Sequence, residues 1–234
     1  MLRNTSQSEF LQYLLASKAE DDLPSLNDLS EQMGVSVAAL REQVEAAKTL
    51  GLVDVRPRTG MRRLPDSFFP AVWQSLAYAI ELDVANFRAI AEFRDHIEAA
   101  YWHQSVALLT SSDHAELKAL VTSAWEKLRG EPVEIPHTEH RQLHMGIFKR
   151  LENLFVTGML EAYWQAYEAV GLNLYADYTH LTQVWTYHQQ LVEAIQAGDF
   201  ELGYQYLIAH QDLLFRLPVI EKPAVLSTRV RRDT

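Results

Sequence analysis

Two histidines placed almost symmetrically about a helix-breaking Gly-Asp pair restrict how this 234-residue chain can fold. His188 and His210 lie about eleven residues on either side of Gly198-Asp199, in segments whose apolar residues recur at helical spacing. If these segments are antiparallel helices joined at the pair, both imidazoles lie at one level, roughly 16 Å from the turn. His140 and His144 are four residues apart and therefore share one face of a helix. A helical bundle that brings these side chains together predicts a transition-metal site.

The composition favours a globular and mostly helical protein. Hydrophobic residues make up 48% of the chain, and it contains only nine glycines. The absence of cysteine excludes disulfides and any thiolate metal site. No apolar run is as long as a membrane span, and the N-terminus lacks the basic and apolar regions of a signal peptide. We therefore expect a cytoplasmic protein with no membrane partner.

Residues 1–65 show three short helical patterns followed by two strand-like runs. We expect the helices at about residues 6–17, 26–33 and 37–50, and the strands at 52–55 and 61–64. Ser25 and Ser36 are suited to cap the second and third helices, and Gly51 to end the third. Two helices with a glycine turn, a third helix and a hairpin follow the order of a winged helix-turn-helix. This order predicts a DNA-binding domain whose third helix enters the major groove.

Arginines concentrate at the tip of the expected hairpin, in the stretch from Arg56 to Arg63. Residues 1–65 carry eight Lys/Arg and nine Asp/Glu, so nearly all of the net charge of −10 belongs to the rest of the chain. A solvated turn is the alternative interpretation, but arginines in this place are suited to bind phosphate or the minor groove. The candidate DNA-binding residues are Ser36, Arg41, Arg56, Arg58, Gly60 and Arg62.

Beyond a Pro-bounded linker at residues 65–70, long amphipathic segments predict an all-α bundle of six to seven helices. Helix breakers separate the segments at about 70–82, 84–109, 113–129, 138–151, 154–172, 178–197 and 199–215. We assign residues 66–217 to one effector-binding, metal-binding and dimerisation domain. Residues 218–234 contain two prolines and the run RVRR, and we expect a flexible tail there.

Several motifs extend these patterns into a family resemblance over nearly the whole chain. The stretches LPSLNDLSEQMGVSVAALRE and LGLVDVRPRTG resemble the winged helix of GntR-type transcription regulators. FRDHIEAA, LHMGIFKRLEN and HQQLVEAIQAGDFELGYQYLIAH resemble the helical FCD domain of the FadR branch. The resemblance implies a homodimer that binds a palindromic operator and responds to a small molecule, often a carboxylate. The implied function is a ligand-responsive DNA-binding regulator, with repression as the expected output.

The resemblance also implies a divalent metal held by an Asp-x-x-x-His pair and two later histidines. Carried onto this chain, the ligands are His144, His188 and His210, while His140 occupies the aspartate position. An all-nitrogen site favours zinc, nickel or copper over manganese or magnesium, and we take zinc as the first candidate and nickel as the second. An orientation of His140 away from the site, leaving three ligands and water, is the alternative. His137 and Glu139 lie on other faces of the helix and are not expected to be ligands.

Arg94 is the candidate effector-binding residue. It lies four residues before Glu98, so an ion pair on the helix surface is one interpretation. A guanidinium that faces a cavity and binds a carboxylate in bidentate fashion is the other. Tyr163, Trp164, Trp185 and Tyr187 either line that pocket or pack in the core and at a dimer interface.

The DNA-reading positions depart from the family pattern. Asn27 occupies a position where the family usually has arginine, and Val37–Ala39 replace its arginine-containing run, although Arg41 is kept. Two alternatives to the regulator therefore stay open. One is a metal-dependent helical-bundle enzyme, against which the chain offers no evident general base. The other is a protein-interaction module whose head has lost specific DNA contacts.

Overall fold

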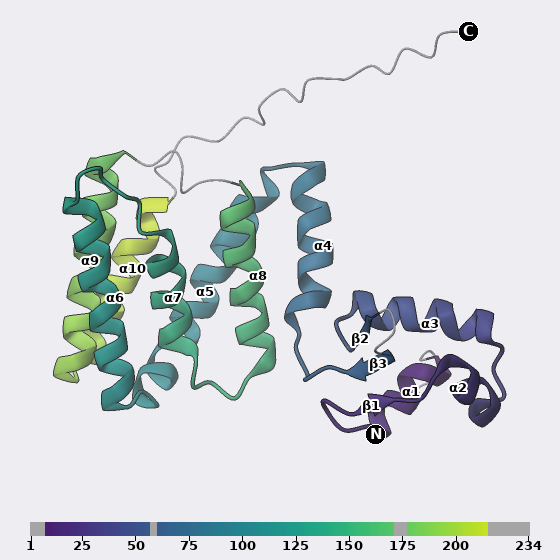
Figure 1. The fold of residues 1–234 in the computed structure, drawn as a ribbon. Helices are drawn as coiled ribbons and strands as arrows, with labels where there is room; N and C mark the ends of the chain where they lie inside the picture. The colour runs from purple at the N-terminus through teal and green to yellow at the C-terminus, as the bar shows by residue number, and fades with distance from the viewer. Residues whose placement is uncertain (1–7, 57–59, 171–176, 215–234) are drawn as a thin grey trace, which may run out of the picture. The chain divides into compact units, whose positions relative to one another are not determined.

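A computed structural model describes residues 8–56, 60–170 and 177–214, which form ten helices and a small three-stranded sheet (Figure 1). Contacts divide the chain into two compact units. The first contains residues up to 76 together with 151–162, and the second contains the remainder. The predicted mainly α fold, with a winged helix-turn-helix and a helical bundle, is confirmed. The predicted flexible tail at 218–234 lies outside the described residues.

Serines begin each of the three helices of the first unit. These helices are α1, α2 and α3, which span Glu9–Ala16, Leu26–Met33 and Val37–Thr49. The side chains of Ser8, Ser25 and Ser36 each accept a hydrogen bond from a backbone N–H in the first turn. Gly34 adopts φ 67° and ends α2, so that α3 can start three residues later. The caps predicted at Ser25 and Ser36 are confirmed.

The sheet of the first unit contains one strand that the sequence did not predict. Its strands are β1 (Asp22–Leu23), β2 (Val53–Arg56) and β3 (Gly60–Arg63), in the antiparallel order β1-β3-β2. The expected hairpin is present, with Val55 opposite Met61. We expected residues 20–24 only to end the first helix. A two-residue strand has no measurable periodicity, and its pairing with β3 arises only from the tertiary fold.

Apolar residues from all three helices and from the hairpin form one small core in the first unit. Its fully buried members come at helical spacing from α1 and α3, and at alternate positions from the strands. They are Phe10, Leu14, Leu29, Leu40, Val44, Ala47, Val53 and Met61. This core fixes the orientation of α3, the helix whose exposed face carries Arg41.

The second unit is a bundle in which α9 and α10 pack against each other along their length (Figure 1). Gly198 adopts φ 74° between them, a left-handed conformation in which the chain reverses. Helix α6 contacts α7 and α9, while α5 contacts α7 and α10. The unit boundaries fall within α4 and α8. The helices are α4 (Phe69–Leu82), α5 (Asn86–Ala107), α6 (Ser111–Arg129), α7 (His137–Phe148), α8 (Leu154–Val170), α9 (Tyr178–Ala197) and α10 (Phe200–Leu214).

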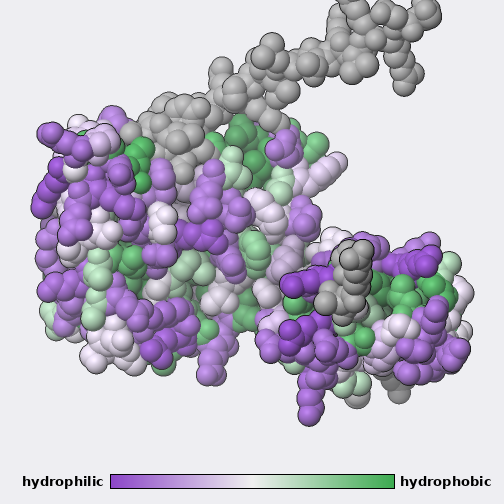
Figure 2. Space-filling view, in the orientation of Figure 1, coloured by the Kyte–Doolittle hydropathy of each residue, from purple (hydrophilic) through white to green (hydrophobic). Residues whose placement is uncertain are grey.

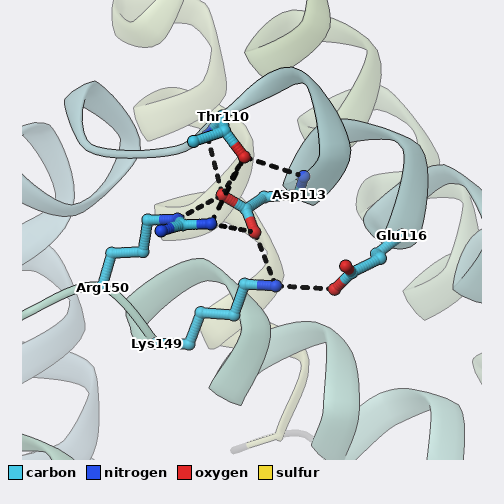
Figure 3. A network of polar contacts seen from close by, with 5 residues as sticks. All are labelled: Thr110, Asp113, Glu116, Lys149 and Arg150. Atoms are coloured by element: carbon cyan, nitrogen blue, oxygen red, sulfur yellow. Dashed lines mark hydrogen bonds and ion pairs between the residues drawn. The ribbon is translucent and has the colours of Figure 1, made fainter.

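A polar network joins the start of α6 to the C-terminal end of α7 (Figure 3). The buried carboxylate of Asp113 forms a capping box with Thr110 and accepts hydrogen bonds from Arg150. It also lies 2.6 Å from Nζ of Lys149, which contacts Glu116 at the same distance. These hydrogen bonds, those from Arg150 and Lys149 foremost, hold the pKa of Asp113 well below its usual value. The network therefore anchors α7, the helix that carries two of the four histidines.

The visible face of the molecule is largely hydrophilic, with scattered apolar side chains (Figure 2). Tyr78 and Leu82 on α4 are among the most exposed large apolar residues. None of the described helices is both long and apolar enough to cross a membrane.

Candidate metal centre

The four predicted histidines converge inside the second unit. Helix α7 supplies His140 and His144, α9 supplies His188, and α10 supplies His210. One ring nitrogen from each lies within 4.8 Å of those of the other three. The Nε2 atoms of His144 and His188 are 3.2 Å apart. The alternative in which His140 points away from the cluster does not match the structure.

Burial keeps most of these imidazoles neutral. His144 and His188 are almost inaccessible to solvent, and His140 is partly buried. Burial lowers the pKa of His140, His188 and His210 well below the usual 6.5, and the nearby imidazoles and Arg94 lower it further. A neutral imidazole keeps a lone pair on one ring nitrogen, which is the form that binds a metal.

The unsatisfied nitrogens of the cluster fit a bound transition metal. Among the described residues, Nε2 of His140 and Nδ1 of His188 and His210 are buried without a hydrogen-bond partner. Buried polar atoms without partners are rare and need an explanation, and an ion would supply it at His140 and His210. His188 instead approaches His144 with Nε2. Two nitrogen ligands of one tetrahedral zinc, each at about 2.0–2.1 Å, lie about 3.3 Å apart. The separation of 3.2 Å between His144 and His188 is close to this value.

Glu98 of α5 supports His144 from the side opposite the cluster. Its Oε1 lies 3.0 Å from Nδ1 of His144, and its Oε2 accepts a hydrogen bond of 2.7 Å from Nη1 of Arg94. Burial alone would raise the pKa of Glu98, but Arg94 and His144 outweigh it and lower the pKa to about 2. An ionised carboxylate only accepts, so Nδ1 of His144 donates and its Nε2 presents a lone pair to the cluster. The sequence indicated Glu98 only as a partner of Arg94, because its contact with α7 depends on the tertiary fold.

A small cavity borders the histidine cluster, and Arg94 is one of its walls. The cavity measures about 40 Å³, which is room for a few water molecules or a small anion. Arg94 is buried and also donates to Oη of Tyr163 at 3.2 Å. The ion pair with Glu98 is present, but it is buried and not on the helix surface, and Arg94 also lines the cavity. Its binding of an effector carboxylate stays a prediction. Other lining residues are His140, Tyr163, Tyr167, Trp185 and His210.

Two histidines that the sequence set aside also line the cavity. We expected His137 on another face of α7 than His140, but it borders this space, and so does His180, for which the sequence indicated no role. His137 precedes His144 by seven residues, two turns of helix, and that spacing was the signal for a shared face. Neither belongs to the four-histidine cluster. The expectation about the face of His137 is therefore wrong.

The aromatic residues near the site are mostly buried, as one of the two interpretations expected. Trp164 lies with its ring centroid 4.7 Å from that of His140, and Trp185 lies 4.8 Å from His188. Tyr163 and Trp185 also line the cavity. These rings exclude water from the cluster and lower the local dielectric constant, which strengthens interactions with a charge.

In the first unit, the candidate DNA-binding residues that the structure describes lie on exposed positions. Ser36 caps α3 and Arg41 follows on its exposed face. Arg56 pairs with Asp54 at 2.6 Å, and Nε of Arg62 donates to the carbonyl oxygen of Glu20 at 2.8 Å. Gly60 begins β3 with φ 93°.

The stretch from Arg56 to Arg63 contains two further arginines, Arg58 and Arg63. Arg58 lies outside the described residues. Arg63 is buried and pairs with Asp66 at 2.5 Å, so it stabilises the end of the hairpin. The exposed positive charge of the described wing therefore comes from Arg56 and Arg62, each next to an acidic residue.

Known proteins share both the sequence pattern and the fold. Residues 89–213 match the FCD domain family, a range that includes Arg94, Glu98 and all four clustered histidines. The chain is 24% identical over 191 residues to the uncharacterized HTH-type transcriptional regulator YieP of Escherichia coli (strain K12), covering 78% of this chain and 80% of that protein. A solved structure, Streptococcus agalactiae GntR, is similar with a TM-score of 0.67 and 17% identity, covering 88% of this chain and 95% of that one.

Proposed function

Because this chain belongs to the GntR-type transcription regulators with an FCD domain, we propose that it is a ligand-responsive repressor with a histidine-bound metal in its effector domain. Regulators of this family are not enzymes, so the metalloenzyme alternative is set aside. The observation that carries the proposal is the convergence of four imidazoles, three of them with an unpaired buried nitrogen.

His140, His144, His188 and His210 would hold the ion. Four nitrogen donors favour zinc, with nickel as the second candidate, over manganese and magnesium. When bound, the ion would supply a positive charge beside the cavity that attracts an anionic oxygen. The surrounding aromatic rings exclude water, and Glu98 holds the imidazole of His144 in place.

We propose a small carboxylate as the effector. Arg94 places a permanent positive charge at the cavity wall, next to His140 and His210. The small cavity volume, about 40 Å³, supports a compact anion. Occupation of the cavity would alter the packing of α5, α7 and α10, and we expect this change to alter operator affinity.

We propose that the first unit binds a palindromic operator as part of a homodimer. Ser36, Arg41, Arg56, Arg58, Gly60 and Arg62 are the proposed contacts. The exposed start of α3 carries Ala38 where an arginine could read guanine. The wing arginines therefore contribute a larger share of the affinity for DNA. They contact phosphate, and phosphate contacts carry little sequence information.

Elemental analysis of the untagged protein tests the metal site. We expect about one zinc or nickel per chain in the wild type and none in the double variant His188→Ala/His210→Ala. The matched control is His96→Ala/His103→Ala, which removes two histidines outside the cluster and should keep its metal. Full metal content in the first variant would refute the site.

A gel shift with a palindrome-containing promoter fragment tests DNA binding. We expect a shift that weakens steeply with salt, because arginine–phosphate contacts release counterions. Arg41→Ala and Arg56→Ala should weaken it, whereas Lys118→Ala in α6 of the second unit should not. No shift at low salt would favour the protein-interaction module.

A further inference from the structure

Glu98 is a fully buried carboxylate whose two oxygens serve different partners. Oε1 contacts Nδ1 of His144 at 3.0 Å, and Oε2 accepts from Nη1 of Arg94 at 2.7 Å. Its side chain has no exposed surface. Arg94 reaches the cavity wall, and His144 reaches the histidine cluster. One carboxylate thus connects the two parts of the site.

The four clustered histidines differ in the hydrogen-bond partners of their imidazoles. A metal-bound imidazole usually donates its other N–H to a carboxylate, a carbonyl or water, which fixes its tautomer and orientation. Among the ion pairs of the described residues, His144 is the one clustered imidazole that contacts a carboxylate, while Nδ1 of His188 has no partner. Glu98 is therefore the carboxylate that accepts a hydrogen bond from an imidazole of the cluster.

A comparison with Glu139 shows what a purely structural carboxylate looks like in this bundle. Glu139 is also nearly buried and lies next to His140 in the sequence. It pairs with Lys127 at 2.7 Å and accepts from Oγ of Ser123 at 3.0 Å. It contacts no imidazole of the cluster, and Glu98 differs in this respect.

We propose that Glu98 is a positioning residue that sets the tautomer and orientation of His144 for metal binding while it holds Arg94 at the cavity. This inference rests on the proposed metal site. Both Arg94 and His144 donate, and only a carboxylate can accept from both at once. Arg94 in turn fixes the side chain of Glu98 in the orientation that faces His144.

The variant Glu98→Gln separates this role from simple stabilisation. Arg94 and His144 contact different oxygens of Glu98, and an amide has only one acceptor atom, so glutamine in this orientation cannot offer an acceptor to each of them. If the oxygen faces Arg94, the NH₂ group faces His144 and favours the tautomer with Nε2 protonated, which cannot bind a metal. Loss of such an outer partner usually weakens metal binding by about 10–100-fold.

The test is a cobalt titration of the full chain against a competing chelator, with the visible absorption of Co²⁺ as a second readout. We expect Glu98→Gln to bind Co²⁺ about 10–100-fold more weakly, with an altered spectrum. Glu139→Gln, the matched control, should change neither quantity although it also loses a buried ion pair. Unchanged cobalt affinity and spectrum in Glu98→Gln would overturn the inference.

A measurement on the wild type keeps the inference falsifiable if Glu98→Gln does not fold. In the metal-free protein, ¹⁵N NMR of the imidazoles should show His144 protonated at Nδ1. Protonation at Nε2 would overturn the inference. A wild type that binds no cobalt refutes the metal site and this inference together, whereas normal binding in both wild type and variant refutes this inference alone.

Discussion

At the scale of single residues, His140 distinguishes this chain from the pattern that its family resemblance implies. An imidazole stands where that pattern has an aspartate. Its ring lies 5.2 Å from that of His144 and 4.8 Å from that of His188, within the cluster. The proposed donor set therefore consists of nitrogen alone and lacks a carboxylate, which would change both the charge and the softness of the site.

Replacing His140 by aspartate should restore an oxygen donor and shift the metal preference. We expect His140→Asp to keep one ion per chain and to raise the affinity for Mn²⁺ relative to Zn²⁺ on the order of tenfold. Competition titration of the two ions measures the ratio. His137→Asp adds the same charge at the cavity and outside the cluster, and should leave the ratio unchanged. An identical ratio in His140→Asp and wild type would contradict the assignment of His140 as a ligand.

Asp113 gives a prediction about stability and pH. Hydrogen bonds from Arg150 and Lys149 hold its pKa well below the usual 3.8 in the folded state. A carboxyl with a lowered folded pKa contributes stability that is fully present above the unfolded pKa and is lost as the pH falls below it. We expect Asp113→Asn to lower Tm by several degrees at pH 7. Below pH 3.8 the difference from wild type should narrow.

The control for Asp113 is Glu116→Gln. Glu116 also contacts Lys149 but is exposed, and an exposed ion pair contributes little. Its Tm should therefore stay near that of wild type. Equal Tm values for Asp113→Asn and wild type at pH 7 would show that the network in Figure 3 does not anchor α7.

At the scale of elements, apolar periodicity and helix breakers predicted the helices well. Ser36, Gly51 and Gly198 lie where a cap, a helix end and a reversal were expected. Strand β1 was missed because two residues carry no pattern. The contact of Glu98 with His144 was missed because it depends on how α5 and α7 pack. His137 was missed although its spacing from His144 within α7 indicated a shared face. Residue spacing predicted which four histidines converge, whereas the carboxylate partner of His144 comes from another helix.

The reversal between α9 and α10 depends on Gly198. Its φ of 74° is strained for other residues, and nothing lies within 4 Å of a Cβ placed there. Gly198→Ala should therefore lower the free energy of unfolding by about 1–2 kcal/mol through backbone strain alone, as measured by denaturant titration. Metal stoichiometry should not change. Gly198→Asn should lower the free energy of unfolding by less, because asparagine tolerates this conformation. A free energy of unfolding in Gly198→Ala equal to that of wild type would contradict the strain at this position.

At the scale of the whole molecule, two units with separate cores place the candidate DNA contacts and the candidate metal site in different parts of the chain. The four clustered histidines come from three helices of the second unit. A ligand that binds only the folded state stabilises that state by mass action. The metal would therefore contribute to the stability of this unit as well as to its proposed response to an effector.

Removal of the metal should lower the thermal stability of the chain. At a free zinc concentration 100 times the Kd, the contribution is about 2.7 kcal/mol, which corresponds to a Tm difference of about 5–10 °C. Differential scanning fluorimetry with a chelator and with added Zn²⁺ measures it. The variant His188→Ala/His210→Ala should show no response to either addition. A zinc response of equal size in that variant would place the ion elsewhere.

The two indoles beside the cluster have an optical consequence. Trp164 and Trp185 lie within 5 Å of ligand imidazoles, ring centre to ring centre. Their emission therefore depends on the electronic state of whatever the imidazoles hold. Cu²⁺ or Ni²⁺, with unfilled d shells, would quench the emission, whereas Zn²⁺, with a filled shell, would leave it bright. The protein thus carries its own fluorophores for identifying its ion, without a label or a bound effector.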